Sequence, residues 1–208
     1  MCEPLANMAL FIIPEGAATG KGANQVICML HFYLENLSLG EAEVVLNVDN
    51  CVGQNKNQFM ISYLCWRVLS GLHKITLHFL VVGHKIFTRL CRGCVQEIFR
   101  RTPCSTPADI AECASKSRVL YPVITGSIDG EHQDVPMHDW QGKFASFHSV
   151  PGMKKYHVFQ FSSENSGVVV CKEYCDSAPV SFTLVARDCS DSSLPPDLPS
   201  LGLSHRRQ

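Results

Sequence analysis

The hydrophobic residues of the chain follow two spacings in turn, which predicts strands alternating with helices. Residues 8–13, 43–49 and 75–82 are short, nearly continuous apolar runs, a pattern typical of strands that are buried on both faces. Between them, residues 20–37 and 56–69 carry apolar side chains at helical spacing. Because the links are short, this order predicts right-handed crossovers and a parallel sheet in an α/β fold.

Capping signals mark where two of the helices begin. Asn55 stands where an N-cap is expected, and Gln58 follows three residues later in a capping-box pattern. Further along, Thr106 suits an N-cap, Pro107 the first helical position and Asp109 the third. The sequence therefore predicts helices beginning after Asn55 and after Thr106.

The second half of the chain predicts further helices and strands before a polar tail. From residue 189 onward, Ser, Asp and Pro dominate and apolar residues become sparse, which predicts a disordered tail over residues 189–208. We therefore expect one domain over residues 1–188. The remaining predicted elements are helices at 89–101 and 139–147 and strands at 156–162, 168–172 and 180–185.

The balanced charge of the chain limits how it could bind nucleic acid. With 208 residues and 46% hydrophobic content, the chain can bury a core. Its 18 Lys and Arg residues are balanced by 19 Asp and Glu residues, so nucleic-acid binding would need a local basic patch. The same cluster of cations also suits a solvated helix face. The candidate patch, called the basic segment below, consists of Lys85, Arg89, Arg92, Arg100 and Arg101.

The cysteines and the N-terminus indicate an intracellular protein in the nucleus or cytoplasm. Eleven scattered cysteines form no regular framework, and residues 1–13 lack the pattern of a signal peptide. The apolar run of residues 75–82 is too short to span a membrane. Neither secretion nor membrane insertion is therefore expected.

Two cofactor motifs are incomplete. Cys91 and Cys94 have a zinc-like spacing, but a second close pair is missing, so we predict free cysteines rather than zinc. Gly16 and Lys21 lie in a glycine-rich link that fails the phosphate-loop spacing, with Gly22 where Ser or Thr should hold magnesium. We therefore infer no small-molecule substrate.

One motif carries a resemblance to a known family. DNCVGQNKN at residues 49–57 follows a predicted strand, and another strand ends in VVGH at residues 81–84. Together with MKKYHVFQF at residues 153–161, these segments resemble a family of uncharacterised, transposon-derived animal proteins. That family is similar to ribonuclease-H-like transposases with a DDE or DDD triad. The resemblance covers residues 9–84 and 153–161 best.

The resemblance implies an incomplete ribonuclease-H-like fold and a role for Asp49. In such a fold Asp49 would be the second of three acids that hold Mg²⁺ for DNA strand cleavage or transfer. His84 would be a nearby ligand or base, or else a structural histidine. Without the resemblance, Asp49 and Asn50 equally suit a tight turn.

The chain also departs from the family pattern. It begins near the third strand of such a fold, and Leu90 stands where the third acid is expected, with Glu97 the only acid in the following predicted helix. A single acid cannot hold two metal ions, so we expect a truncated or diverged member that no longer binds Mg²⁺ or cleaves DNA. Three hypotheses remain: a metal-dependent nuclease, a nucleic-acid-binding module that uses the basic segment, and a degenerate fragment.

Overall fold

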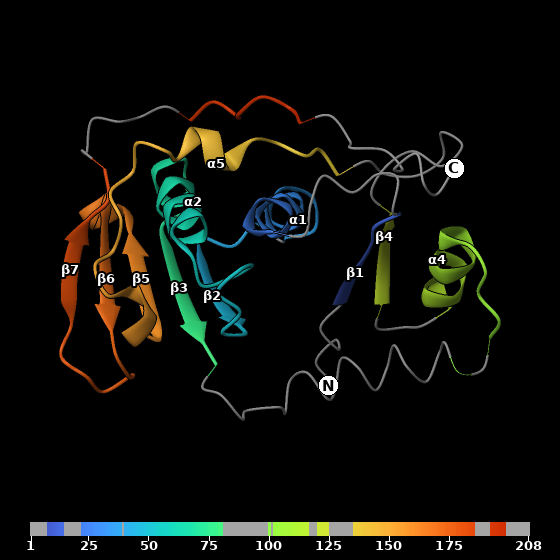
Figure 1. Cartoon of the computed structure of the whole chain (residues 1–208), viewed down its shortest axis with the longest axis horizontal. Coiled ribbons are helices and arrows are strands. Elements are labelled where there is room, and N and C mark those ends of the chain that lie inside the picture. Colours follow the sequence, from blue (N-terminus) through green and yellow to red (C-terminus); the bar gives the residue numbers. More distant parts are fainter. Residues whose placement is uncertain are drawn as a thin grey trace. The chain divides into compact units, whose positions relative to one another are not determined.

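The computed structural model forms two compact units, which are described separately (Figure 1). The first unit contains residues 1–19, 84–136 and 199–208, and the second contains residues 20–83 and 137–198. The structure describes residues 8–14, 22–38, 40–80, 100, 102–116, 120–124, 135–185 and 192–198.

The second unit is built on a five-stranded sheet in the order β2-β3-β5-β6-β7. β2 and β3 are parallel, whereas β3, β5, β6 and β7 pair in antiparallel fashion. The sheet is therefore mixed, with its one parallel pair at one side. The strands are β2 (Glu43–Val48), β3 (Lys74–Phe79), β5 (Val158–Ser162), β6 (Val168–Lys172) and β7 (Val180–Thr183).

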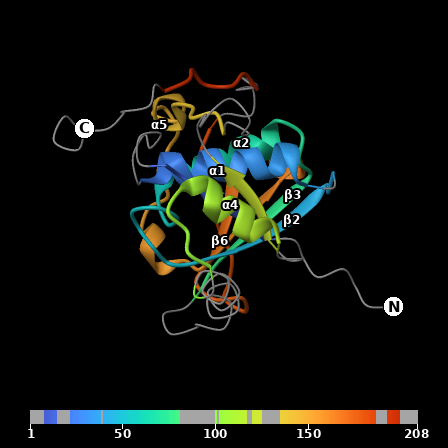
Figure 2. The same ribbon diagram turned by 90° about the vertical axis from the view of Figure 1, so that its right-hand side faces the viewer.

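Two helices lie beside the sheet because its strands present an apolar face. α1 (Ala23–Asn36) packs on α2 (Gln58–Leu69), which packs on β3 and β5. Alternate residues of β3 and β5, such as Leu77 and Phe159, are fully buried, as expected for a sheet with one covered face. Figure 2 shows α1 and α2 next to each other on one side of the strands.

The predicted α/β class is confirmed, but two details of the sheet differ. β2 was expected to be buried on both faces, yet its residues alternate between half-buried and exposed, with Val45 64% exposed. The exposed residues alternate with half-buried ones, so one face of β2 is open to solvent and the other is covered only in part. Among the described residues β3 is the one strand that pairs with β2, which makes β2 an edge strand of this sheet. β1 (Met8–Ile12) does not join this parallel pair and instead pairs with β4 (Leu120–Ile124).

An aromatic core joins α1 and α2 to the short helix α5 (Trp140–Lys143). Trp140 is fully buried and lies 5.0 to 5.2 Å, between ring centroids, from His31, Tyr63 and Trp66. Asn24 fixes the approach of α5, because its Nδ2 donates to the His138 carbonyl at 2.7 Å and its Oδ1 accepts from Trp140 N at 2.9 Å.

Part of the predicted disordered tail is ordered against this core. His138 pairs with Asp197 as an isolated bridge, Asp139 N donates to the Pro196 carbonyl, and Lys143 Nζ donates to the Ser193 carbonyl at 2.7 Å. The prediction of disorder from residue 189 is therefore wrong for residues 192–198. Backbone pairing, which composition does not encode, holds this polar segment in place.

The first unit contains a parallel pair of strands and a capped helix. α4 (Pro107–Ser115) packs on β4 and β1. Its predicted start is confirmed: Thr106 Oγ1 accepts from Asp109 N at 3.1 Å, and Asp109 Oδ2 accepts from Thr106 N at 2.8 Å. These hydrogen bonds form a reciprocal capping box. No helix among the described residues has the length and apolarity that a membrane span requires.

Candidate functional site

Asp49 lies where an open α/β sheet usually binds its ligands. It follows Val48, the last residue of β2, and its side chain is exposed. Val48 pairs with Phe79, the last residue of the parallel strand β3. Asp49 therefore follows the end of a strand, as predicted, and ligands of open α/β sheets bind outside the carboxyl ends of such strands.

The motif folds around the Asp49 carboxylate. Its Oδ1 accepts hydrogen bonds from Cys51 N at 3.2 Å and from the Asn55 side-chain amide. The Cys51 carbonyl in turn accepts from the backbone N–H groups of Gln54, Asn55 and Lys56, at 2.8 to 3.3 Å. Asp49 therefore holds a tight loop together. Its side chain accepts hydrogen bonds from residues of its own turn, as the alternative prediction of a turn residue requires.

Lys56 fixes this loop to the chain segment before β5. It is only 2% exposed, and its Nζ donates to the Lys154 carbonyl at 2.9 Å and lies 5.1 Å from the centroid of the Phe79 ring. Burial lowers the pKa of Lys56, because a charged ammonium loses its hydration there. The lysine is thus a structural clamp rather than a surface cation.

The end of the motif begins α2 and joins it to residues 148–150. Asn57, not Asn55, is the N-cap, because its side chain accepts from Met60 N at 3.1 Å. Gln58 Nε2 donates to the His148 carbonyl at 2.7 Å, and Gln58 Oε1 accepts from Val150 N at 3.1 Å. The predicted N-cap is wrong by two residues because Asn55 is used to hold Asp49.

We expect Asn57→Ala to lower the free energy of unfolding by about 1 kcal/mol, since the Met60 N–H loses its acceptor at the helix start. Asn57→Asp keeps the acceptor oxygen for Met60 N but loses the bond from Asn57 Nδ2 to the Gln54 carbonyl, so it should cost less than Asn57→Ala. Urea unfolding of both variants measures the difference. An equal loss in the two variants would contradict the assignment of Asn57 as the cap.

The described residues do not fit the Mg²⁺ site that the resemblance implies. Among them, no group of three His, Cys, Asp or Glu side chains is placed to hold a metal ion. A two-metal centre needs several carboxylates, whereas Asp49 Oδ1 is already bonded to two donors of its own loop.

The structure describes only some of the other predicted site residues. Arg100 of the basic segment is exposed. Tyr63 and Trp66, on the helix after the motif, are core residues, with 0% and 3% exposure. Sequence reasoning missed the clamp formed by Lys56, since a lysine in a polar loop is usually solvated. Outside the described residues lie His84, Lys85, Arg89, Arg92 and Arg101.

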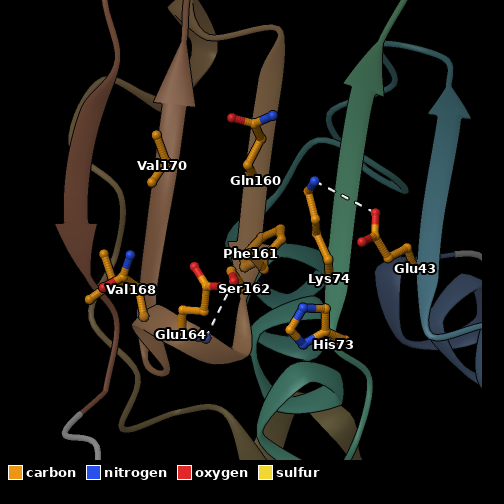
Figure 3. Close-up of a pocket in the computed structure, with 10 residues that line it drawn as sticks. Glu43, His73, Lys74, Gln160, Phe161, Ser162, Glu164, Val168 and Val170 are labelled. Atoms are coloured by element: carbon orange, nitrogen blue, oxygen red, sulfur yellow. Dashed lines mark hydrogen bonds and ion pairs between the residues drawn. The ribbon is translucent and has the colours of Figure 1, made fainter.

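A pocket of about 430 Å³ lies at the opposite end of the sheet (Figure 3). Glu43 and Lys74 form an ion pair of 3.6 Å beside it, and His73 Nδ1 lies 2.7 Å from Ser163 Oγ. Glu43 is the first residue of β2 and Asp49 follows the last, so about 20 Å separates them at roughly 3.3 Å per residue. The pocket is therefore distinct from the Asp49 loop.

Comparison with known proteins gives one family. A family model for a domain of unknown function, DUF7869, matches residues 15–177, about four-fifths of the chain. No curated protein and no solved structure matches the chain. The matched region includes the Asp49 loop and all of β5 and β6.

Proposed function

The chain belongs to the DUF7869 family, and on this premise we propose that it is a nucleic-acid-binding domain of transposon origin. In this proposal the domain is a diverged, incomplete ribonuclease-H-like fold that binds nucleic acid at the Asp49 end of the sheet without cutting it. The observation that carries the proposal is the exposed Asp49 loop at the carboxyl end of β2, built by the family-like motif.

Three features support binding without cleavage. The order β2, α2, β3 with an acid after β2 agrees with the later part of a ribonuclease-H-like fold. Asp49 Oδ1 accepts from its own loop, which gives the acid a structural role without any metal. The basic segment supplies the cations that phosphates require.

The test uses the full chain with labelled single-stranded and duplex DNA. If three phosphates are contacted, we expect duplex affinity to fall about 40-fold between about 50 and 200 mM salt. Replacing the five cations of the basic segment by glutamine should flatten this salt dependence. Binding that ignores salt, or no binding at all, would remove the proposal.

Cleavage is tested in parallel on supercoiled plasmid with Mg²⁺. We expect wild type and Asp49→Asn to nick the plasmid equally, at the background rate, because Asp49 serves the loop. Nicking that requires Mg²⁺ and disappears in Asp49→Asn would instead identify an active nuclease. Binding to duplex DNA by the same variant serves as the control for folding.

A further inference from the structure

We propose that Tyr174, stacked on His157 and accompanied by Lys154 and Lys155, forms a platform for an unpaired base of single-stranded nucleic acid. This inference rests on the proposed function and adds to it a second binding surface, separate in sequence from the basic segment. It also names the form of nucleic acid that this surface would recognise.

The platform is a pair of flat rings held at the protein surface. The His157 and Tyr174 rings are nearly parallel, with an angle of 10° and 5.5 Å between centroids. His157 is half-buried, whereas Tyr174 remains 52% exposed. An aromatic ring that is stacked on one neighbour and open to solvent offers a π surface to a further ring.

Hydrogen bonds fix the His157 ring and the backbone of the turn that carries Tyr174. His157 Nδ1 donates to the Glu173 carbonyl at 3.0 Å, and His157 N donates to the Lys172 carbonyl at 3.0 Å. Two hydrogen bonds between Tyr174 and Ser177 close the turn that carries Tyr174. Tyr174 N donates to Ser177 Oγ, and Ser177 N donates to the Tyr174 carbonyl, both at 3.1 Å. A base would therefore meet a surface that needs little ordering.

The platform lies at the same end of the sheet as Asp49. Val48 pairs with Phe79, Phe79 N donates to the His157 carbonyl at 2.8 Å, and His157 bonds to Lys172. Neighbouring strands are about 4.8 Å apart, so His157 lies roughly 10 Å across the sheet from the end of β2. In Figure 1 the carboxyl ends of β2 and β3 and the turn between β6 and β7 share the lower end of the sheet.

The charged residues next to the platform in sequence lie on two different segments. Lys154 and Lys155 are exposed on the segment before β5, and the Lys154 carbonyl is held by Lys56 of the Asp49 loop. The acids Glu173 and Asp176 are exposed on the turn that carries Tyr174. Phosphates would therefore lie over the two lysines, while the base covers the ring.

This arrangement favours a single strand over a duplex. Bases in a duplex are already stacked on their neighbours and cannot cover an isolated ring without unpairing. In a single strand the bases are free, and each base stacked on an aromatic side chain contributes about 1–3 kcal/mol. The flat, open Tyr174 ring thus selects unpaired bases without reading their sequence.

The experiment measures binding of the full chain to labelled oligo(dT) and to a duplex of equal length. We expect Tyr174→Ala to weaken oligo(dT) binding about 5- to 150-fold and to leave duplex binding unchanged. Tyr174→Phe keeps the ring and should bind within about twofold of wild type, whereas Tyr174→Leu, apolar but not planar, should behave like the alanine variant.

The lysines are tested by salt dependence. Lys154→Gln with Lys155→Gln should reduce the slope of log affinity against log salt for oligo(dT) by about 1.4. Lys116→Gln removes an exposed lysine of the other unit that is paired with Glu112, and should leave the slope unchanged. An unchanged slope in the double variant would overturn the role given to the lysines.

The outcomes separate this inference from the proposed function. If wild type binds duplex DNA but Tyr174→Ala weakens oligo(dT) and duplex equally, or weakens neither, the platform is refuted while the proposed function stands. If wild type binds neither probe, the proposed function itself fails. Thermal unfolding of each variant confirms that binding is compared between folded proteins.

Discussion

Replacing Trp140 by alanine is expected to cost about 3–5 kcal/mol of the free energy of unfolding, as for other buried aromatic residues. Trp140 is fully buried and in ring contact with α1 and α2 residues, and it stacks on Phe144 at 5.8 Å. Its removal opens a cavity where α5 meets both helices. Because domains are stable by only about 5–15 kcal/mol, much of the protein should unfold at moderate urea concentrations.

Urea unfolding followed by far-UV circular dichroism measures this loss. Leu194→Ala is the matched control, because Leu194 lies in residues 192–198 but is 53% exposed, and its loss should stay within about 0.5 kcal/mol. A Trp140→Ala variant as stable as Leu194→Ala would mean that α5 does not pack on α1 and α2 in solution.

Acid is expected to destabilise the protein through His31. This residue is 8% exposed, its Nδ1 is hydrogen-bonded to the Tyr63 hydroxyl at 3.2 Å, and its ring lies 6.1 Å from that of His138. Burial, followed by the nearby Arg67 charge, lowers the pKa of His31 to about 4, although Glu35 opposes the effect. The folded state therefore keeps His31 neutral.

The sign of the effect follows from proton linkage. Between pH 6.5, the ordinary histidine pKa, and pH 4, the unfolded chain binds a proton that the folded protein does not. The stabilisation from a neutral His31 is thus present above pH 6.5 and is lost as the pH falls, by about 3 kcal/mol at pH 4. Glutamine does not titrate, so between neutral pH and pH 4 the His31→Gln variant should lose about 3 kcal/mol less free energy of unfolding than wild type.

Urea midpoints at neutral and acidic pH measure this difference. His148→Gln, the same substitution at an exposed histidine of the same unit, is the control variant. Parallel curves for wild type and His31→Gln would show that folding does not lower the pKa of His31.

Hydrophobic spacing predicted the elements but not all of their partners. α1, β2, α2 and β3 begin and end within a few residues of their predicted positions, because helical and strand periods are local properties. The insertion of β5 between β3 and β6 depends on pairings between distant residues. Periodicity does not encode such pairings, so the edge position of β2 was missed.

The sequence predicted where the candidate loop lies in the fold but not which hydrogen bonds hold it. The end of β2 just before Asp49 was predicted correctly, since an apolar run that stops at a carboxylate is visible in sequence. The N-cap was predicted at Asn55 and lies at Asn57, because the loop closes on the Cys51 carbonyl with three successive N–H groups and delays the start of the helix. That geometry depends on tertiary packing.

β2 also has a consequence for handling the protein. Among the described residues, no strand pairs with its outer side, and Glu43 is its only charged residue. Native edge strands usually carry lysine, proline or a bulge that blocks pairing with another chain, whereas Val45 here faces solvent. Val45 is 64% exposed on this strand, so a lysine in its place is expected to make concentrated samples more soluble.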